Sequence, residues 1–221
     1  GINTTAGLYA QYMSETQYTD ISRYATQTLN WDGFYAGAMY DLQNIINTNS
    51  DPATAAAAAE FGANANQIAI ARILKAYYFS VLTDAWGDVP YSQALKGNGT
   101  IPYDKQETIY PALIAELKAA NAQFTTGAAV QGDIMYAGNT TKWKKFANSL
   151  IATLSLRMSK ANPTLGRAEF AAAVAGGVID ANADNATITY PGGNYQNPVY
   201  AYYVVTQRFD YAVSSTVTDK L

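Results

Sequence analysis

Two aspartates, Asp84 and Asp88, lie four positions apart in the sequence, and Asp104 and Glu107 follow in the next segment. Paired carboxylates perform glycoside hydrolysis when one acts as the acid and the other as nucleophile or base. Asp84 and Asp88 also lie beside the negative end of a predicted helix, an unfavourable place for a purely structural carboxylate. No surrounding motif assigns the two catalytic roles, so we expect no enzymatic activity and no catalytic residue.

The sequence contains no His and no Cys. Thiol catalysis, disulfides and thiolate metal sites are therefore excluded, and the commonest general base and metal ligand are absent. The net charge is −3, and Lys142, Lys144 and Lys145 form the one basic cluster, which is too small for a phosphate backbone. We expect no cofactor, no metal and no nucleic-acid partner.

Tyrosine is abundant, with 18 residues beside 3 Trp and 7 Phe. Tyr and Trp combine a rigid apolar face with a hydrogen-bonding edge, which suits stacking on sugar rings or anchoring a protein interface. Residues 190–203 concentrate five tyrosines with side-chain amides that can satisfy sugar hydroxyls. The predicted ligand-binding residues of this segment are Tyr190, Asn194, Tyr195, Asn197 and Tyr200. A protein-facing role for the same segment stays open.

Apolar residues recur at three- and four-residue steps over 70–85, which predicts a helix with one apolar face wide enough to pack on two neighbours. Gly87 and Pro90 end this helix and force the chain to turn. Trp86 and Tyr91 at the turn are further candidate ligand-binding residues. Because Trp is usually largely buried, packing of Trp86 against its own helix end is favoured over stacking on a ligand.

Most of the sequence from residue 31 to about residue 175 has the apolar periodicity of helices, and the sequence beyond it is irregular. Residues 1–29 have no clean period and indicate a loop or a partly helical arm. Apolar periodicity and capping signals predict helices over 31–47, from 51 toward 84, over 106–124, over 141–160 with its end at 162–163, and over 167–175. Beyond 178, residues 187–190 alternate as in a strand, and 191–203 are a loop without helical period. The fold class is therefore all-α, with two antiparallel helix pairs over 31–160 and a loop-rich region over 178–221.

Three stretches resemble the SusD/RagB family in the order in which that family has them. Residues 71–95 are close to the family hallmark AxxxRAYYFxxLxDxWGDVPYSxAL. The second stretch is KWKKFANSL at 142–150, which runs on to LRMS at 156–159. The third is RFDY at 208–211 with Ser214 and TDKL at 218–221.

The resemblance implies a tetratricopeptide-like helical repeat with long irregular loops. It also implies a non-catalytic lipoprotein on the surface of the outer membrane of a Gram-negative bacterium. Such a protein binds a glycan or another nutrient and delivers it to a TonB-dependent transporter of the SusC type. In the family, the residues around Trp86 are chiefly a fold signature, and the glycan contacts lie in variable loops.

Family members are generally much longer than 221 residues. The resemblance therefore implies that residues 1–221 are an N-terminal portion from which the secretion signal and lipid-bearing Cys are absent, so that contact with the membrane requires an anchor outside this sequence. The 190–203 segment would then face either the ligand, the transporter or the C-terminal half. The alternative function is a helical-repeat scaffold that binds protein without a small-molecule ligand of its own.

Overall fold

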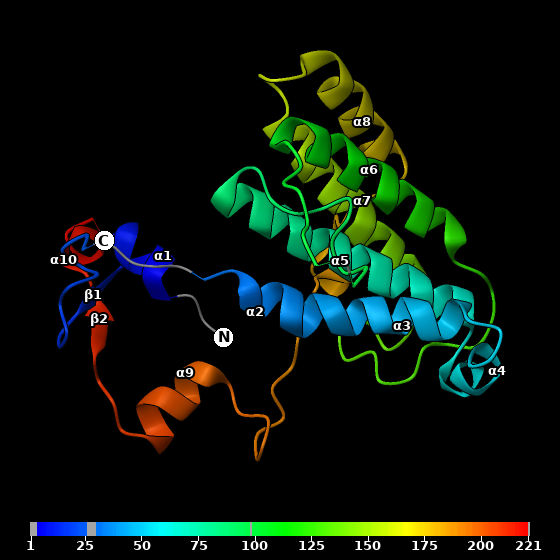
Figure 1. Cartoon of the computed structure of the whole chain (residues 1–221). Helices are drawn as coiled ribbons and strands as arrows, with labels where there is room; N and C mark the ends of the chain where they lie inside the picture. The colour runs from blue at the N-terminus through cyan, green and yellow to red at the C-terminus, as the bar shows by residue number, and fades with distance from the viewer. Residues whose placement is uncertain (1–3, 26–29, 98, 221) are drawn as a thin grey trace. The chain divides into compact units, whose positions relative to one another are not determined.

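The structure is a computed structural model that describes residues 4–25, 30–97 and 99–220 (Figure 1). The chain divides into two units, which are described separately. One is Trp31–Ile188, and the other combines Gly1–Asn30 with Thr189–Leu221. Parts of the predicted 1–29 arm, position 98 of the loop before residue 106, and Leu221 of the third motif lie outside the described residues.

The Trp31–Ile188 unit is built from long helices that lie side by side (Figure 1). They are α3 (Tyr40–Ser50), α5 (Asn64–Trp86), α6 (Gln106–Gln123), α7 (Thr140–Arg157) and α8 (Pro163–Ala175). The shorter elements are α2 (Asp32–Phe34), the π-helix η1 (Tyr35–Met39), α4 (Ala55–Ala58), and the 3-10 helices η2 (Ala59–Phe61) and η3 (Asn182–Asp184). Helices α2, η1 and α3 follow one another without a break, with a kink at Gly37.

Side-chain hydrogen bonds show that successive long helices are antiparallel. Asn66 near the start of α5 bonds to Thr125 beyond the end of α6, and Thr83 near the end of α5 accepts from Gln106 at the start of α6. Helices α3 and α5 are antiparallel by the same criterion, through the pairs Asn49–Gln67 and Gln43–Lys75. Helices α7 and α8 are antiparallel as well, with Asn148 bonded to Gly176 just beyond the end of α8. The predicted antiparallel pairs over 31–160 are confirmed, and α8 extends the array.

Helix α5 packs against three helices, α3, α6 and α7, where the sequence predicted two neighbours. Its burial is correspondingly wider than one face, and Asn66 near its start is fully buried. The Asn66 amide donates to the Thr125 carbonyl at 3.2 Å and accepts from the Thr125 amide at 2.8 Å, so its polar atoms are satisfied. Conversely, Tyr77 and Ala85, which we predicted on the apolar face, are exposed.

Three predicted helix boundaries were wrong. The helix predicted from residue 51 toward 84 is interrupted at Gly62, whose φ of 126° suits glycine and whose Cβ position would lie 2.7 Å from the Ala129 carbonyl oxygen. Helix α7 ends at Arg157, before the predicted 162–163. Asn162 instead caps the start of α8 by accepting from the Leu165 amide, so α8 begins at Pro163 rather than 167.

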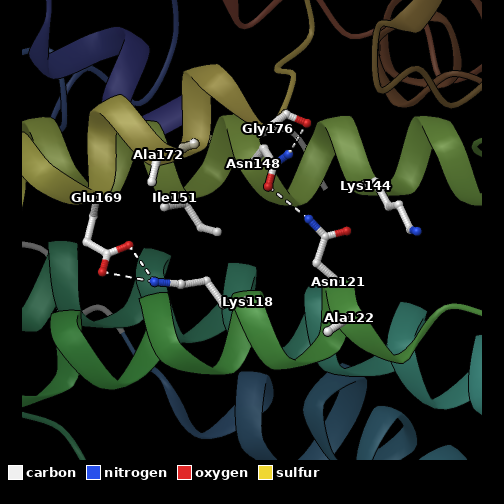
Figure 2. A pocket seen from close by; sticks show the side chains of 10 residues that line it. Lys118, Asn121, Ala122, Lys144, Asn148, Ile151, Glu169, Ala172 and Gly176 are labelled. Atoms are coloured by element: carbon white, nitrogen blue, oxygen red, sulfur yellow. Dashed lines mark hydrogen bonds and ion pairs between the residues drawn. The ribbon is translucent and has the colours of Figure 1, made fainter.

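The Asn148 side chain ties three helices together. Its Nδ2 donates to the carbonyls of Gly176 at 3.0 Å and Gly177 at 2.9 Å, and its Oδ1 accepts from Asn121 on α6 at 2.8 Å. Figure 2 shows these amides in a row between α6 and α8, with the Lys118–Glu169 ion pair farther along the same cleft. The polar groups of this cleft therefore act mainly as cross-links between helices.

The second unit joins the two ends of the chain. Its elements are α1 (Thr4–Tyr9), β1 (Met13–Glu15), α9 (Pro198–Tyr200), the π-helix η4 (Ala201–Val205), β2 (Tyr211–Val213) and α10 (Ser215–Thr218). Strands β1 and β2 pair antiparallel, with Met13 opposite Val213 and Glu15 opposite Tyr211. The prediction that 191–203 lacks helix was wrong, because Asn197 caps α9 and Pro198 occupies its first turn. Residues 187–190 form no strand.

Replacing Trp143 by Ala should destabilise the protein by about 3–5 kcal/mol, the usual cost of removing a core aromatic side chain. Trp143 is 1% exposed, donates from Nε1 to Asp133 at 2.7 Å, and packs edge-on against Tyr136. Denaturant unfolding measures the change. Tyr195→Ala is the control, because Tyr195 is 74% exposed and its loss should change stability by no more than about 0.5 kcal/mol. A larger loss for Tyr195→Ala than for Trp143→Ala would contradict this assignment of core and surface.

Candidate functional site

The loop between α5 and α6 is tied down at both ends by carboxylates. Val89 and Asp104 exchange two backbone hydrogen bonds across the loop, at 3.3 and 2.9 Å. The Asp104 carboxylate accepts from the amides of Tyr91 and Ser92, at 3.0 and 2.8 Å, and from the Ser92 hydroxyl at 2.8 Å. Partial burial acts to raise the pKa of Asp104, but these donors outweigh burial and lower it. Asp104 is thus a structural anion that positions residues 89–92.

The other two carboxylates near the turn also have structural partners. Asp88 accepts from the Lys105 ammonium at 2.7 Å and from the Gln106 amide at 2.9 Å, at the start of α6. The Lys105 contact lowers the pKa of Asp88. Asp84 accepts from Tyr110 and forms an ion pair with Arg157. Their position near the end of α5 is therefore explained by partners on α6 and α7.

A hollow of about 480 Å³ opens beside this loop. Three aromatic side chains lie at its wall, all from the helical segment that starts with α2, and the facing wall comes from the loop. We call it the tryptophan hollow, and its main lining residues are Trp31, Tyr35, Tyr40, Pro90, Leu95 and Ile101. The Tyr35 hydroxyl donates to the Pro90 carbonyl at 2.6 Å and so joins the two walls. Burial raises the pKa of Tyr35, which keeps this hydroxyl protonated.

Trp31 contacts two further aromatic rings at this position. Its ring centroid lies 6.2 Å from that of Trp86 and 5.4 Å from that of Tyr103. Trp86 is half-buried and also contacts Phe34 edge-on, whereas Tyr103 is 61% exposed. Trp86 thus packs against Trp31 and Phe34 at its own helix end, and the most exposed ring of this group is that of Tyr103.

The predicted site residue Tyr91 lies in a separate, smaller pocket. Its ring meets Phe79 edge-on with centroids 4.8 Å apart, and it is half-buried beside Lys75. The Tyr91 backbone is held by Asp104, so the ring position follows from the same carboxylate that fixes the loop.

The five predicted residues between 190 and 200 belong to the other unit and are exposed. A tight turn, closed by two hydrogen bonds between Gly192 and Tyr195, presents Asn194 and Tyr195 to solvent. Asn197 uses its side-chain oxygen to cap α9, accepting from the Val199 amide at 2.9 Å. Tyr190 and Tyr200 are 48% and 51% exposed. These residues remain a predicted binding surface within their own unit.

Sequence reasoning did not identify Trp31, Tyr40 or Tyr103 as site residues. We treated Trp31 as the start of a helix and Tyr103 as part of an unremarkable Gly- and Pro-bearing loop. A usable signal was available, since an aromatic residue at the edge of a loop often lies near a binding surface. The pairing of Trp31 with Tyr103 depends on the packing of α2 beside the loop, which no local pattern reports.

The profile of a protein family described as "Starch-binding associating with outer membrane" matches residues 2–221. The match covers nearly the whole sequence. The chain belongs to the SusD-like family.

Solved structures of SusD-like proteins agree with this assignment. A chitin-binding protein shares 29% identity at a TM-score of 0.79, and the match covers 98% of this chain and 46% of the other. A chitin-binding SusD homologue from Flavobacterium johnsoniae shares 26% identity at a TM-score of 0.75, covering 96% and 46%. A SusD-like protein described as Bacteroidetes AC2a shares 30% identity at a TM-score of 0.72, covering 85% and 35%.

This SusD-like chain thus spans less than half the length of these relatives. No protein of curated function matches it in sequence. Among the residues that the structure describes, no helix is long and apolar enough to cross a membrane.

Replacing Asp104 by Asn should lower the stability of the protein at neutral pH. Because the pKa of Asp104 is lower in the folded state than the unfolded value of about 3.9, its stabilising effect is present above that value and disappears as the pH falls through the folded pKa. Unfolding by urea at several pH values should therefore show a deficit for the variant that is full at pH 7 and shrinks below about pH 4. A deficit that stays constant down to pH 2 would contradict the role of the ionised carboxylate.

Proposed function

We propose that the chain is the glycan-capturing part of a non-catalytic surface protein, which binds a saccharide and delivers it to a SusC-like, TonB-dependent transporter in the outer membrane. The family match and the chitin-binding relatives support a carbohydrate ligand. The observation that carries the proposal is the tryptophan hollow, an open volume of sugar size lined by Trp31, whose ring is in contact with the exposed ring of Tyr103.

Capture needs only reversible stacking and hydrogen bonding. A sugar ring laid on Trp31 or Tyr103 buries its apolar face, while nearby hydroxyl and backbone groups satisfy its polar edge. Weak affinity at one such surface is sufficient when the transporter is held nearby, because the effective concentration of the ligand is then high. The exposed tyrosines at 190–200 supply a second surface for glycan or for the transporter.

Tyr103→Ala should weaken oligosaccharide binding about two- to tenfold, the range expected when one stacking contact of about 0.5–1.5 kcal/mol is lost. Titration calorimetry with chitin- and starch-derived oligosaccharides measures the change. Tyr77→Ala is the matched control, because Tyr77 is an exposed tyrosine on α5 that contacts Phe146 outside the hollow. Equal affinities for wild type and Tyr103→Ala would argue against stacking of the sugar on the Tyr103 ring beside Trp31.

Tyr195→Ala and Tyr200→Ala should each weaken binding of glycan or transporter while the thermal midpoint stays nearly unchanged, since both side chains are exposed. Binding isotherms for both partners decide between the two roles of this segment. If the chain binds a SusC-like transporter and no glycan at all, the alternative function as a protein-interaction scaffold replaces the proposal.

No sugar should be released when the chain is incubated with a panel of glycans, because each carboxylate near the turn is held by a structural partner. Chromatography of the incubated glycans is the measurement. Release that disappears in Asp84→Asn or Asp88→Asn would overturn the non-catalytic assignment.

A further inference from the structure

The small pocket beside Tyr91 combines an apolar wall with several hydrogen-bond donors and two lysines. It has a volume of about 240 Å³ and lies between α3, α5, α6 and the loop after α5. Its polar lining residues are Gln43, Lys75, Tyr91, Ser92, Lys96 and Glu116. Leu95 lines both this pocket and the tryptophan hollow, so the two cavities adjoin within the same unit.

Lys75 is half-buried and lacks an ionic partner. Its ammonium donates to the Gln43 side-chain oxygen at 2.8 Å, and the Gln43 amide nitrogen donates in turn to Asn47 at 2.8 Å, which fixes the orientation of the amide. Across the described residues, Lys75 belongs to none of the ion pairs. Burial lowers its pKa, an effect that the nearby Glu116 carboxylate opposes. An ammonium removed from water without an ionic partner is costly, so this site favours an added anion.

The carboxylate of Glu116 is already committed to another residue. Arg72 donates to it through Nε and Nη2, both at 2.7 Å, in the bidentate geometry of a strong ion pair. Arg72 thereby neutralises the one carboxylate that lines the pocket, and Lys75 and Lys96 remain as excess positive charge.

Tyr91 adds a neutral donor to these cations. Its hydroxyl has no hydrogen-bond partner in the described part of the chain, and burial raises its pKa to about 12, so it stays protonated at neutral pH. An ammonium has three donors, of which Lys75 uses one on Gln43. The hydrogen-bonding groups of Lys75 and Tyr91 that remain unused in the pocket are therefore mainly donors.

We propose that this pocket binds the carboxylate or sulfate group of an acidic glycan through Lys75 and Tyr91, while the neighbouring sugar lies in the tryptophan hollow. The inference rests on the proposed function and adds to it a preference for saccharides that carry an anionic substituent. The pocket suits one such group in size, and the shared wall at Leu95 places it within reach of a ligand in the hollow.

The test compares trigalacturonic acid with its methyl ester, which differ in the charge of the carboxyl groups. Titration calorimetry of the full chain at fixed ionic strength should show the acid binding at least about tenfold more tightly, since a hydrogen bond to a charged group contributes about 1.5–3 kcal/mol. Lys75→Met should remove this difference. Lys118→Met is the charge-matched control, because Lys118 pairs with Glu169 in the other cleft (Figure 2), and it should keep the difference.

A second readout separates binding from a structural role of Lys75. Because its half-buried ammonium has no ionic partner, Lys75→Met should leave the thermal midpoint unchanged or raise it. Should Lys75→Met fail to fold, Tyr91→Phe removes a single hydroxyl and should weaken the acid about two- to tenfold without affecting the ester.

Three other outcomes would contradict the anion pocket, its assignment to Lys75 and Tyr91, or the glycan as the source of the anion. Equal binding of acid and ester overturns the anion pocket and leaves the proposed glycan function standing. Preference for the acid that persists in both Lys75→Met and Tyr91→Phe overturns the assignment to this pocket. Binding of sodium acetate or sulfate that depends on Lys75, together with no binding of either saccharide, overturns an acidic glycan as the source of the anion, while the proposed function is decided separately by the chitin- and starch-derived oligosaccharides.

Discussion

Helix α5 contacts α3, α6 and α7 at once, and the rest of the Trp31–Ile188 unit is arranged around this burial. A helix enclosed on three sides has little room for unsatisfied polar groups, so Asn66 and Thr83 bond to groups at the ends of the neighbouring helix α6. These bonds also fix how far α6 is shifted along α5. The end of α5 and the start of α6 are thereby held at the same side of the unit, and the loop that joins them lies there.

Carboxylates, together with the aromatic rings, then give this loop its shape. Asp88 holds the start of α6, Asp104 holds the backbone at residues 91–92, and Asp84 joins α5 to α6 and α7. Acidic groups that suggest hydrolysis in the sequence are thus structural supports of the loop beside the proposed binding surface. The same constraints leave Trp31 and Tyr103 at the surface, supported from behind by Trp86. This arrangement is suited to holding a sugar ring and offers no pair of free carboxylates to cleave it.

Local pattern was sufficient to predict that the long helices exist, because their apolar spacing is encoded within a few residues. Ile109, Leu113 and Leu117 recur at four-residue steps in the predicted helix over 106–124 and are fully buried on α6. Features that depend on distant contacts were missed. The break at Gly62 reflects the approach of Ala129, some 67 residues away in sequence (129 − 62), and the site role of Trp31 depends on Tyr103 from another loop. Asn197 and Pro198 are a local signal for the start of α9, but the helix is too short and too rich in tyrosine to show a helical period in the sequence.

The central claim is that the aromatic surface beside the loop after α5 holds a saccharide. Its most direct test is a crystal structure of the chain with a bound chitin- or starch-derived oligosaccharide. The account predicts a sugar ring stacked on Trp31 or Tyr103 in the tryptophan hollow, with Asp84, Asp88 and Asp104 still on their present partners. A saccharide bound only at some other surface, with the hollow empty, would contradict it.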